Sequence, residues 1–206
     1  MTAATPPVRS RLSPDERRAQ LLALGLEMLR ERALHELSVD ELAASAGISK
    51  ALVFHYFGSK PELLQAIASA AADEFIAVTE PDPALSLDDQ LEQSMAAFVR
   101  YVADNQVGYA MLVRGPASTD EAMRELFERT RTRVVDRIID KLGPLDPAPP
   151  GFRLVVRGWV AFAEEVTTTW VSDPSVGEDV LLDLLRDSLT RLVELAFAEP
   201  VVRTGA

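Results

Sequence analysis

The sequence predicts an all-α protein of about nine helices. Apolar residues recur three and four positions apart, and no stretch of five or more residues alternates regularly between apolar and polar side chains. Four segments have the form of a capping box, in which serine is followed three positions later by glutamate. They are Ser13–Glu16, Ser38–Glu41, Ser59–Glu62 and Ser118–Glu121. So many helix starts in one chain are typical of a helical protein.

Clusters of proline and glycine divide the rest of the chain. Pro81 to Pro83, Gly115-Pro116, Gly143 to Gly151 and Asp173-Pro174 separate the expected helices. These helices cover residues 14–32, 39–46, 50–56, 60–79, 87–104, 105–113, 119–141, 152–171 and 177–198. Residues 1–12 are expected to form a flexible arm and residues 201–206 a tail.

The composition indicates a globular protein. Of the 206 residues 48% are hydrophobic, which is enough for a sizeable core. There is no run of eighteen apolar residues, and no apolar segment follows Arg9 and Arg11, so neither a membrane span nor a secretory signal is expected. No cysteine is present, which excludes disulfides and thiol chemistry. A cytoplasmic location is therefore expected.

The charge of the chain is unevenly distributed. The net charge is −11, but residues 1–60 hold eight basic and seven acidic side chains, and residues 61–206 hold thirteen and twenty-five. The acidic excess would repel nucleic-acid phosphates. Any contact with DNA is therefore expected from the N-terminal segment.

Residues 39–57 have the spacing of a helix-turn-helix. A short helix from Val39 to Ala46 ends at Gly47, which adopts a left-handed turn conformation easily. Ile48 would fill the gap between two helices, and Ser49 would cap the second. The spacing alone is equally consistent with an ordinary helical hairpin in a helical core.

The residues from Gly47 to Leu64, with Leu37 to Ala43 before them, closely resemble the signature of the TetR/AcrR family of regulators. The resemblance implies a homodimer with a DNA-binding domain at 13–59 and an effector-binding and dimerisation domain at 60–200. It implies that the helix at about Lys50 to Tyr56 enters the major groove of double-stranded operator DNA. It also implies a repressor that a small-molecule effector releases from DNA. The rest of the chain resembles the family only in helix number and length.

The same resemblance implies a set of DNA-contacting residues. Lys50 and Lys60 would bind phosphate, while His55 and Tyr56 would meet phosphates and base edges. The serine at the start of the helix is as well explained by helix capping, and His55 by a solvated surface position. The leucine replaces a frequent Thr or Ser, so it either contacts a thymine methyl group or only packs. The residues are Ser49, Lys50, Leu52, His55, Tyr56 and Lys60.

The last two expected helices, 152–171 and 177–198, are apolar around more of their surface than one buried face requires. A helix of this kind must be covered on two sides. The resemblance places the dimer interface here, as a bundle of four helices. A monomer that buries both helices in its own core is the alternative.

An effector site is expected among the middle helices. Aromatic and methionine side chains suit a plastic apolar pocket, although each is also explained as ordinary core. The candidates are Phe75, Met95, Phe98, Tyr109, Met111, Phe127, Trp159 and Phe162. The expected ligand is apolar or aromatic. Glu164 and Glu165 would either recognise a cation or form salt bridges.

No enzyme activity, metal or cofactor is expected. The two histidines, His35 and His55, are isolated, and no pair of carboxylates marks a catalytic site. A helical ligand-binding or adapter protein without DNA activity is the alternative function. It explains the body but not the run from Ser49 to Lys60. Arg9 and Arg11 either reach phosphate or the minor groove, or form a basic tail without a partner.

Overall fold

The computed structural model describes residues 12–109, 121–142, 149 and 151–197. Besides a short helical segment at residues 106–109, this part of the chain contains nine helical elements and no β-strand. In chain order they are α1 (Pro14–Glu31), the 3-10 helix η1 (Leu34–Glu36), α2 (Val39–Ser45), α3 (Lys50–Phe57), α4 (Lys60–Val78), α5 (Leu87–Asp104), α7 (Glu121–Lys141), α8 (Phe152–Ser172) and α9 (Glu178–Phe197).

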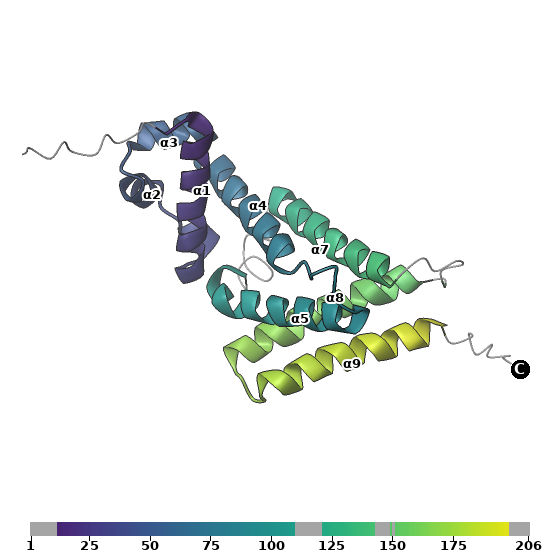
Figure 1. Ribbon diagram of the computed structural model, residues 1–206. Coiled ribbons are helices and arrows are strands. Elements are labelled where there is room, and N and C mark those ends of the chain that lie inside the picture. Colours follow the sequence, from purple (N-terminus) through teal and green to yellow (C-terminus); the bar gives the residue numbers. More distant parts are fainter. Residues whose placement is uncertain (1–11, 110–120, 143–148, 150, 198–206) are drawn as a thin grey trace, which may run out of the picture.

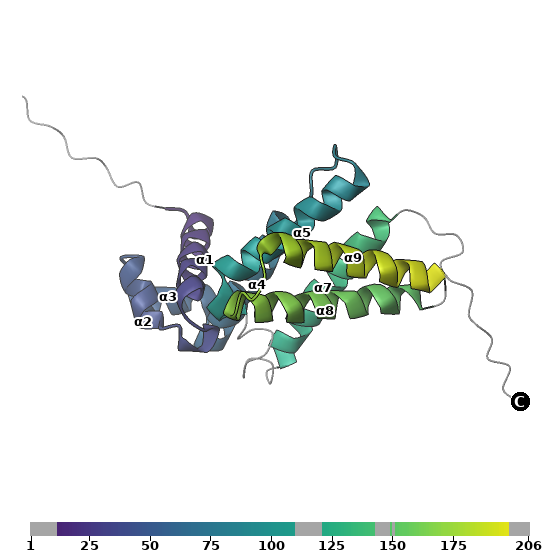
Figure 2. The same cartoon turned by 90° about the horizontal axis from the view of Figure 1, so that it is seen from below.

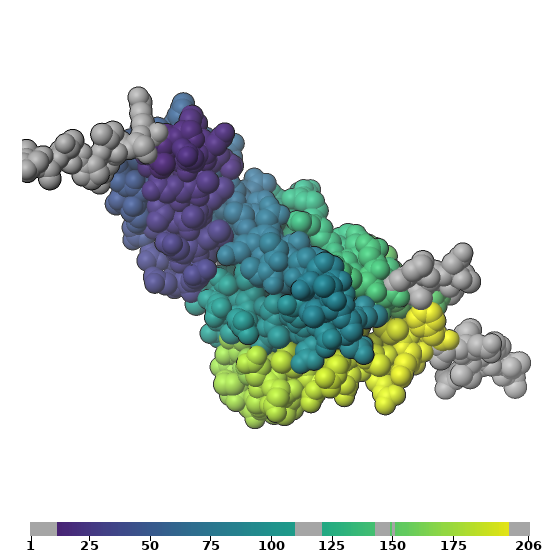
Figure 3. All heavy atoms as spheres, in the orientation of Figure 1, coloured from purple at the N-terminus to yellow at the C-terminus, as the bar shows by residue number. Residues whose placement is uncertain are grey.

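The molecule is elongated, with a small head at one end and a larger body at the other. Helices α1, α2 and α3 form the head, and α4 runs from it into the body (Figure 1). Helices α8 and α9 lie side by side along the body (Figure 2). In the space-filling view the head and α9 lie at opposite ends (Figure 3).

The buried residues of the described chain form two separate hydrophobic cores, one in the head and one in the body. The head core includes Leu21, Leu42 and Val53, and the first half of α4 adds Leu63 and Ile67 to it. The body core is formed by a separate set of buried residues, namely Met95, Val99, Val135, Phe152, Val156, Trp159, Val160, Ala163, Leu181, Leu185 and Leu189. Helix α7 contributes to both cores, with Met123 in the head core and Val135 in the body core, and α4 continues from the head core into the body (Figure 1).

Helices α1 and α4 cross closely at Gly25. A Cβ atom on this glycine would lie 2.6 Å from Cδ1 of Ile67, closer than carbon atoms can approach. Gly25 thus allows α4 to pack directly on the α1 backbone. It is the side chain of Ile67 in α4 that occupies this space against Gly25.

The serine caps explain why the helices begin where they do. Ser13 forms the complete capping box with Glu16, and Ser38 and Ser59 accept hydrogen bonds from the amides of Glu41 and Glu62. The predicted starts at residues 14, 39, 50, 60, 87 and 152 are confirmed. η1 was not predicted, because three residues are too short for a periodic pattern.

Other sequence predictions fall outside the described residues. These include the arm with Arg9 and Arg11, residues 110–113 of the expected helix 105–113, the first three residues of the box at Ser118, and the tail. Within the described ranges, no helix is long and apolar enough to cross a membrane.

Candidate functional site

The helix-turn-helix consists of α2, α3 and residues 46–49. Gly47 has φ +65°, the left-handed conformation that glycine adopts without strain. The amide of Ile48 then donates a hydrogen bond to the carbonyl of Ala43 over 3.0 Å. Ser49 begins α3, since its Oγ accepts a hydrogen bond from the amide of Leu52 over 3.2 Å. The turn predicted from these residues is confirmed.

Helix α3 has one buried and one exposed face. Val53 and Phe57 are 0% and 7% exposed and point into the head core, and the guanidinium of Arg18 lies 5.1 Å from the centre of the Phe57 ring. Lys50 and His55 are exposed on the outer side. An exposed helix fixed by a turn is the geometry that a major groove accepts.

The two lysines of the head differ in their surroundings. Nζ of Lys50 lies 2.9 Å from Oδ2 of Asp40, and both side chains are at least half exposed. Lys60 is exposed at the start of α4 and forms no ion pair with another described residue. An exposed pair such as Lys50 with Asp40 contributes little stability, so phosphate can replace the carboxylate.

A cavity of about 350 Å³, partly open to solvent, lies in the body between α4, α5, α7, α8 and α9. Four aromatic rings gather at the side nearest the head. The centroid of the Phe75 ring lies 6.1 Å from that of Phe98, 5.3 Å from Tyr101 and 6.3 Å from Tyr109. These distances are in the range of favourable edge-to-face contacts.

The two tyrosines of this cluster are held in their neutral form. Burial raises the pKa of Tyr101 to about 12, and its hydroxyl donates to the carbonyl of Ala71 over 3.0 Å. Burial also raises the pKa of Tyr109, and the negative charge of Glu164 adds to the effect. Both hydroxyl groups therefore remain uncharged donors around neutral pH.

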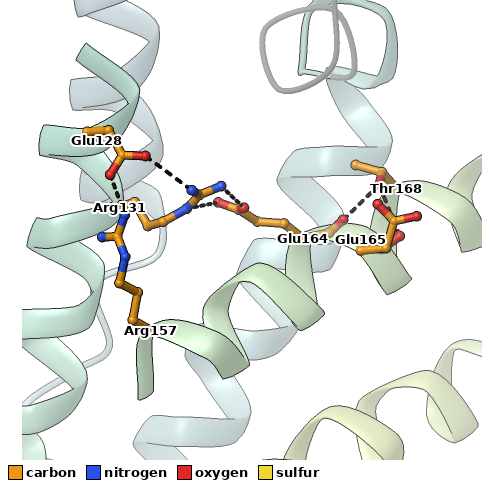
Figure 4. Close-up of polar contacts among 6 residues, drawn as sticks. All are labelled: Glu128, Arg131, Arg157, Glu164, Glu165 and Thr168. Carbon is orange, nitrogen blue, oxygen red and sulfur yellow. Dashed lines mark hydrogen bonds and ion pairs between the residues drawn. The ribbon is translucent and has the colours of Figure 1, made fainter. Parts of the chain in front are cut away.

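An ion-pair network joins α7 to α8 in the cavity wall (Figure 4). Arg131 of α7 pairs with Glu164 of α8 through two contacts, one of them 3.4 Å between Nε and Oε1. Arg131 also lies 3.4 Å from Oε1 of Glu128, which itself binds Arg157. The hydrogen bonds that Arg131 donates to Glu164 raise the pKa of Arg131, and the bond that Arg157 donates to Glu128 lowers the pKa of Glu128. Each buried charge thus has an opposite charge beside it.

Arg137 fixes the end of α4 to α7. Its Nη2 donates to Oγ1 of Thr79 over 2.8 Å, and its Nη1 donates to the carbonyl of Ile76 over 3.0 Å and to Glu80 over 2.9 Å. A cation at this position also satisfies carbonyl groups that a helix end leaves without partners.

The short helical segment 106–109 connects the cavity to the head. A Cβ atom on Gly108 would lie 2.7 Å from the carbonyl oxygen of Leu29 in α1. The next residue, Tyr109, lines the cavity and packs against Phe75. One short segment therefore contacts both the cavity and the last turns of α1.

Comparison with known proteins places the chain among bacterial regulators. Residues 21–67 match the family described as bacterial regulatory proteins, tetR family. Residues 87–193, more than half of the chain, match the tetracyclin repressor-like C-terminal domain. The chain belongs to the TetR family.

Individual relatives agree with this result. The HTH-type transcriptional activator FasR of Mycolicibacterium smegmatis is 24% identical over 168 residues, which is 80% of this chain and 76% of FasR. The HTH-type transcriptional regulator EthR of Mycobacterium tuberculosis is 42% identical over 55 residues, 27% of this chain and 26% of EthR. A crystal structure of a tetR-family regulator from Streptomyces coelicolor has a TM-score of 0.80 and 28% identity, covering 90% of this chain and 83% of that one.

Membership of the TetR family decides between the two functions considered from the sequence. The protein is a DNA-binding transcriptional regulator. A ligand-binding or adapter protein without DNA activity is not supported, and the relatives are regulators rather than enzymes. In the described part of the chain, no group of three or more His, Asp or Glu side chains could hold a metal ion.

The structure brings most of the expected effector residues to one cavity. Phe75, Met95, Phe98, Tyr109, Phe127 and Trp159 line it. Phe162 does not, because Trp159, Val160, Ala163 and Glu164 form the cavity-facing side of α8 and Phe162 points to another side of the same turn. Met111 lies outside the described residues.

Sequence analysis did not identify the charged residues of the cavity wall on α7. Arg131 and Arg137 lie at helical spacing from Phe127, together with Thr130 and Val134. This stripe of residues at helical spacing was the signal from which the two arginines could have been predicted to line the cavity. Sequence analysis left Glu164 as either a cation-binding residue or a salt-bridge partner, and in the structure it pairs with Arg131.

Proposed function

We propose that this TetR-family regulator is a homodimeric repressor that a small apolar ligand releases from operator DNA. In this proposal residues 13–59 bind DNA and residues 60–200 bind the ligand and the second subunit. The observation that carries it is the position of α4, which forms part of the head core at Ile67 and part of the cavity wall at Phe75. A ligand that displaces the second half of α4 moves the head as well.

The DNA contacts are assigned to the exposed side of the helix-turn-helix. Lys50 and Lys60 would bind phosphate, and Ser49 would add a hydroxyl contact to its capping bond. His55 and Tyr56 pack edge to face with ring centroids 5.6 Å apart, which orders both rings for contact with phosphates or base edges. Leu52 is half-buried, and its free side is suited to a thymine methyl group.

The dimer interface is assigned to one face of α8 and α9. Leu154, Gly158 and Ala161 of α8 and Val180, Leu184 and Leu195 of α9 are exposed, and we call this set the α8–α9 face. Leu154 and Leu195 are 73% and 68% exposed, although α8 buries its valines Val156 and Val160 and α9 buries three other leucines in the body. Two such faces would form a four-helix bundle across a two-fold axis, which suits an operator with two half-sites.

The coupling between ligand and operator is tested by calorimetry. Linkage requires that operator DNA weaken effector binding by the factor by which the effector weakens operator binding, typically about 5- to 150-fold. Effector affinity should therefore be lower in the presence of a saturating operator duplex than in its absence. Equal affinities in the two titrations would show that the cavity does not control DNA binding.

Transcriptional activation is a second candidate, because FasR is named an activator. The two alternatives differ in a reporter assay with the promoter bound by the protein. Deletion of the protein raises expression if it represses and lowers expression if it activates. The assay leaves the assignment of DNA and ligand contacts unchanged.

A further inference from the structure

We infer that the ligand is a single-chain amphiphile, whose hydrocarbon chain lies extended along the cavity and whose polar end donates a hydrogen bond at the cavity mouth. The inference rests on the proposed function, since it names the class of ligand for the same cavity. Three features support it: the length of the cavity relative to its volume, the pairing of the charged groups inside it, and an unpartnered oxygen at its mouth.

The cavity is long because α5 and α7 each contribute a whole face to it. On α7 the lining residues run from Leu126 to Lys141, which at 1.5 Å per residue is about 22 Å. On α5 they run from Leu87 to Tyr101, about 21 Å by the same rise per residue. Contacts between the helices show that these faces run along one axis.

Pairs of residues fix the relative direction of these helices. Asp73 with Arg133 and Glu80 with Arg137 show that α4 and α7 run in parallel. The bond from Tyr101 to Ala71 shows that the end of α5 lies near the middle of α4, so α5 runs in the opposite direction. The cavity is thus a channel from the ring cluster near the head to the far ends of α5 and α7.

The volume is small for this length. An engineered cavity of about 150 Å³ holds one benzene molecule, so 350 Å³ in a rounded shape would hold a compact ligand of a few rings. Spread over about 20 Å, the same volume forms a narrow passage that fits one chain. At about 1.3 Å per methylene, a chain of roughly 14 to 16 carbons reaches from the mouth to the ring cluster.

The two arginines of the inner channel each have a carboxylate partner, Arg131 in Glu164 and Arg137 in Glu80, so neither requires a charged ligand. Arg131 and Glu164 neutralise each other, and an anion or cation that separated them would leave one buried charge without its closest partner. Thr130 donates its hydroxyl to the carbonyl of Leu126. The inner channel is therefore suited to a hydrocarbon.

Among the described residues at the mouth, one buried side-chain oxygen has no hydrogen-bond partner. Oε1 of Gln90 is buried and accepts no hydrogen bond, whereas Nε2 of the same side chain donates to the carbonyl of Leu85 over 2.8 Å. Gln90 lines the cavity in the first turn of α5, beside Leu87. A ligand with a donor at its polar end would satisfy this oxygen, and its chain would then point inward.

Binding can be followed by the fluorescence of Trp159, which lines the channel, in a Trp170→Phe background that removes the second tryptophan. The probes are n-alkanols from octanol to hexadecanol, each below its solubility limit. We expect affinity to rise about fourfold per added methylene until the chain fills the channel, and then to level off. Pyrenemethanol, with the same hydroxyl on four fused rings, should bind at least tenfold more weakly than hexadecanol.

Two substitutions test where the chain and its polar end lie. Ala72→Phe narrows the inner half of the channel on α4, so it should move the levelling-off to shorter alcohols and leave octanol unaffected. Gln90→Met should remove the preference, about two- to tenfold, for an alcohol over a methyl ether of equal length. Glu92→Phe, on the exposed side of α5 outside the channel, is the matched control and should change neither result.

Failure of the inference differs from failure of the proposed function. Affinity that does not depend on chain length, or pyrenemethanol bound as tightly as hexadecanol, overturns the extended chain. If the Gln90→Met variant keeps the same preference for an alcohol over a methyl ether as the unsubstituted protein, the proposed position of the polar end is wrong. If long alcohols bind but do not release a labelled operator duplex, the ligand class stands and the proposed coupling fails.

Discussion

The three lysines of the chain allow the DNA contacts to be tested one residue at a time. Lys50 and Lys60 lie in the proposed DNA-binding head, and Lys141 lies in the cavity wall at the far end of the body. A phosphate contact contributes in proportion to the counterions it releases, so it affects all DNA sequences similarly.

We predict that Lys60→Ala lowers affinity for operator and random DNA alike, and reduces the slope of log affinity against log salt by about one unit. Lys50→Ala should lower the affinity in the same way but by a smaller factor, because Lys50 must give up its contact with Asp40 before it binds phosphate. Lys141→Ala serves as the control of equal charge change. Fluorescence anisotropy at several salt concentrations measures the slopes, and an unaltered slope in both head variants would contradict the assignment.

A second prediction concerns the pH dependence of stability. The pKa of Tyr101 is about 12 in the folded protein and about 10 in an unfolded chain. Below pH 10 both states hold the proton and the contribution to stability is complete. As the pH rises from 10 to 12, the unfolded state releases the proton first, and the free energy of unfolding falls.

Tyr101→Phe should therefore flatten the decrease in the free energy of unfolding between pH 10 and pH 12. At pH 7 the variant should lose about 1 kcal/mol, because the bond to Ala71 is removed. Urea unfolding at pH 7, 10 and 11 measures both effects. A decrease as steep as in the unsubstituted protein would show that Tyr101 ionises normally.

At the scale of elements, the contact between the segment 106–109 and α1 is the most restrictive. The atom nearest to a Cβ on Gly108 is the backbone oxygen of Leu29, which cannot move aside as a side chain can. Any side chain at this position must separate the segment from α1. Because Tyr109 follows directly, the cavity wall would move too.

Gly108→Ala is accordingly predicted to weaken operator binding about fivefold or more without any ligand, and to lower the free energy of unfolding by about 1 to 3 kcal/mol. Val107→Ala, at an exposed neighbouring position, is the control for local helix effects. Operator titrations of both variants decide the matter. Normal operator affinity in Gly108→Ala would remove this segment from the coupling route.

Local sequence signals were sufficient for most helices and for the turn. Capping serines and Gly47 act within four residues, so the starts of α1, α2, α3 and α4 could be read from the sequence. The pairing of Arg131 with Glu164 joins residues 33 positions apart and depends on how α7 crosses α8. Phe162 was assigned to the cavity by residue type, but its position on the helix decides which way it points.

On the scale of the whole molecule, the proposed dimer interface at the α8–α9 face can be tested by one substitution. We predict that Leu184→Glu yields a monomer, because the carboxylate would be buried against the second subunit. Leu85→Glu changes an exposed leucine in the α4–α5 connection and should leave the dimer intact. Sedimentation at micromolar concentration measures the masses, and a folded monomer of the unsubstituted chain would contradict the proposed interface.

The separation of head and body along the long axis also affects how the protein finds DNA. Residues 61–206 carry a charge of −12 and residues 1–60 a charge of +1, and Figure 3 shows the two parts at different ends. Close to a duplex, the phosphates exert a torque that turns the acidic end away, so the molecule rotates head first before any contact forms.

Added salt then has two opposite effects. It would weaken the proposed phosphate contacts of the head, and it would screen the repulsion of the body over a Debye length of about 8 Å at physiological ionic strength. The rate of association should for this reason fall less with salt than the lifetime of the complex.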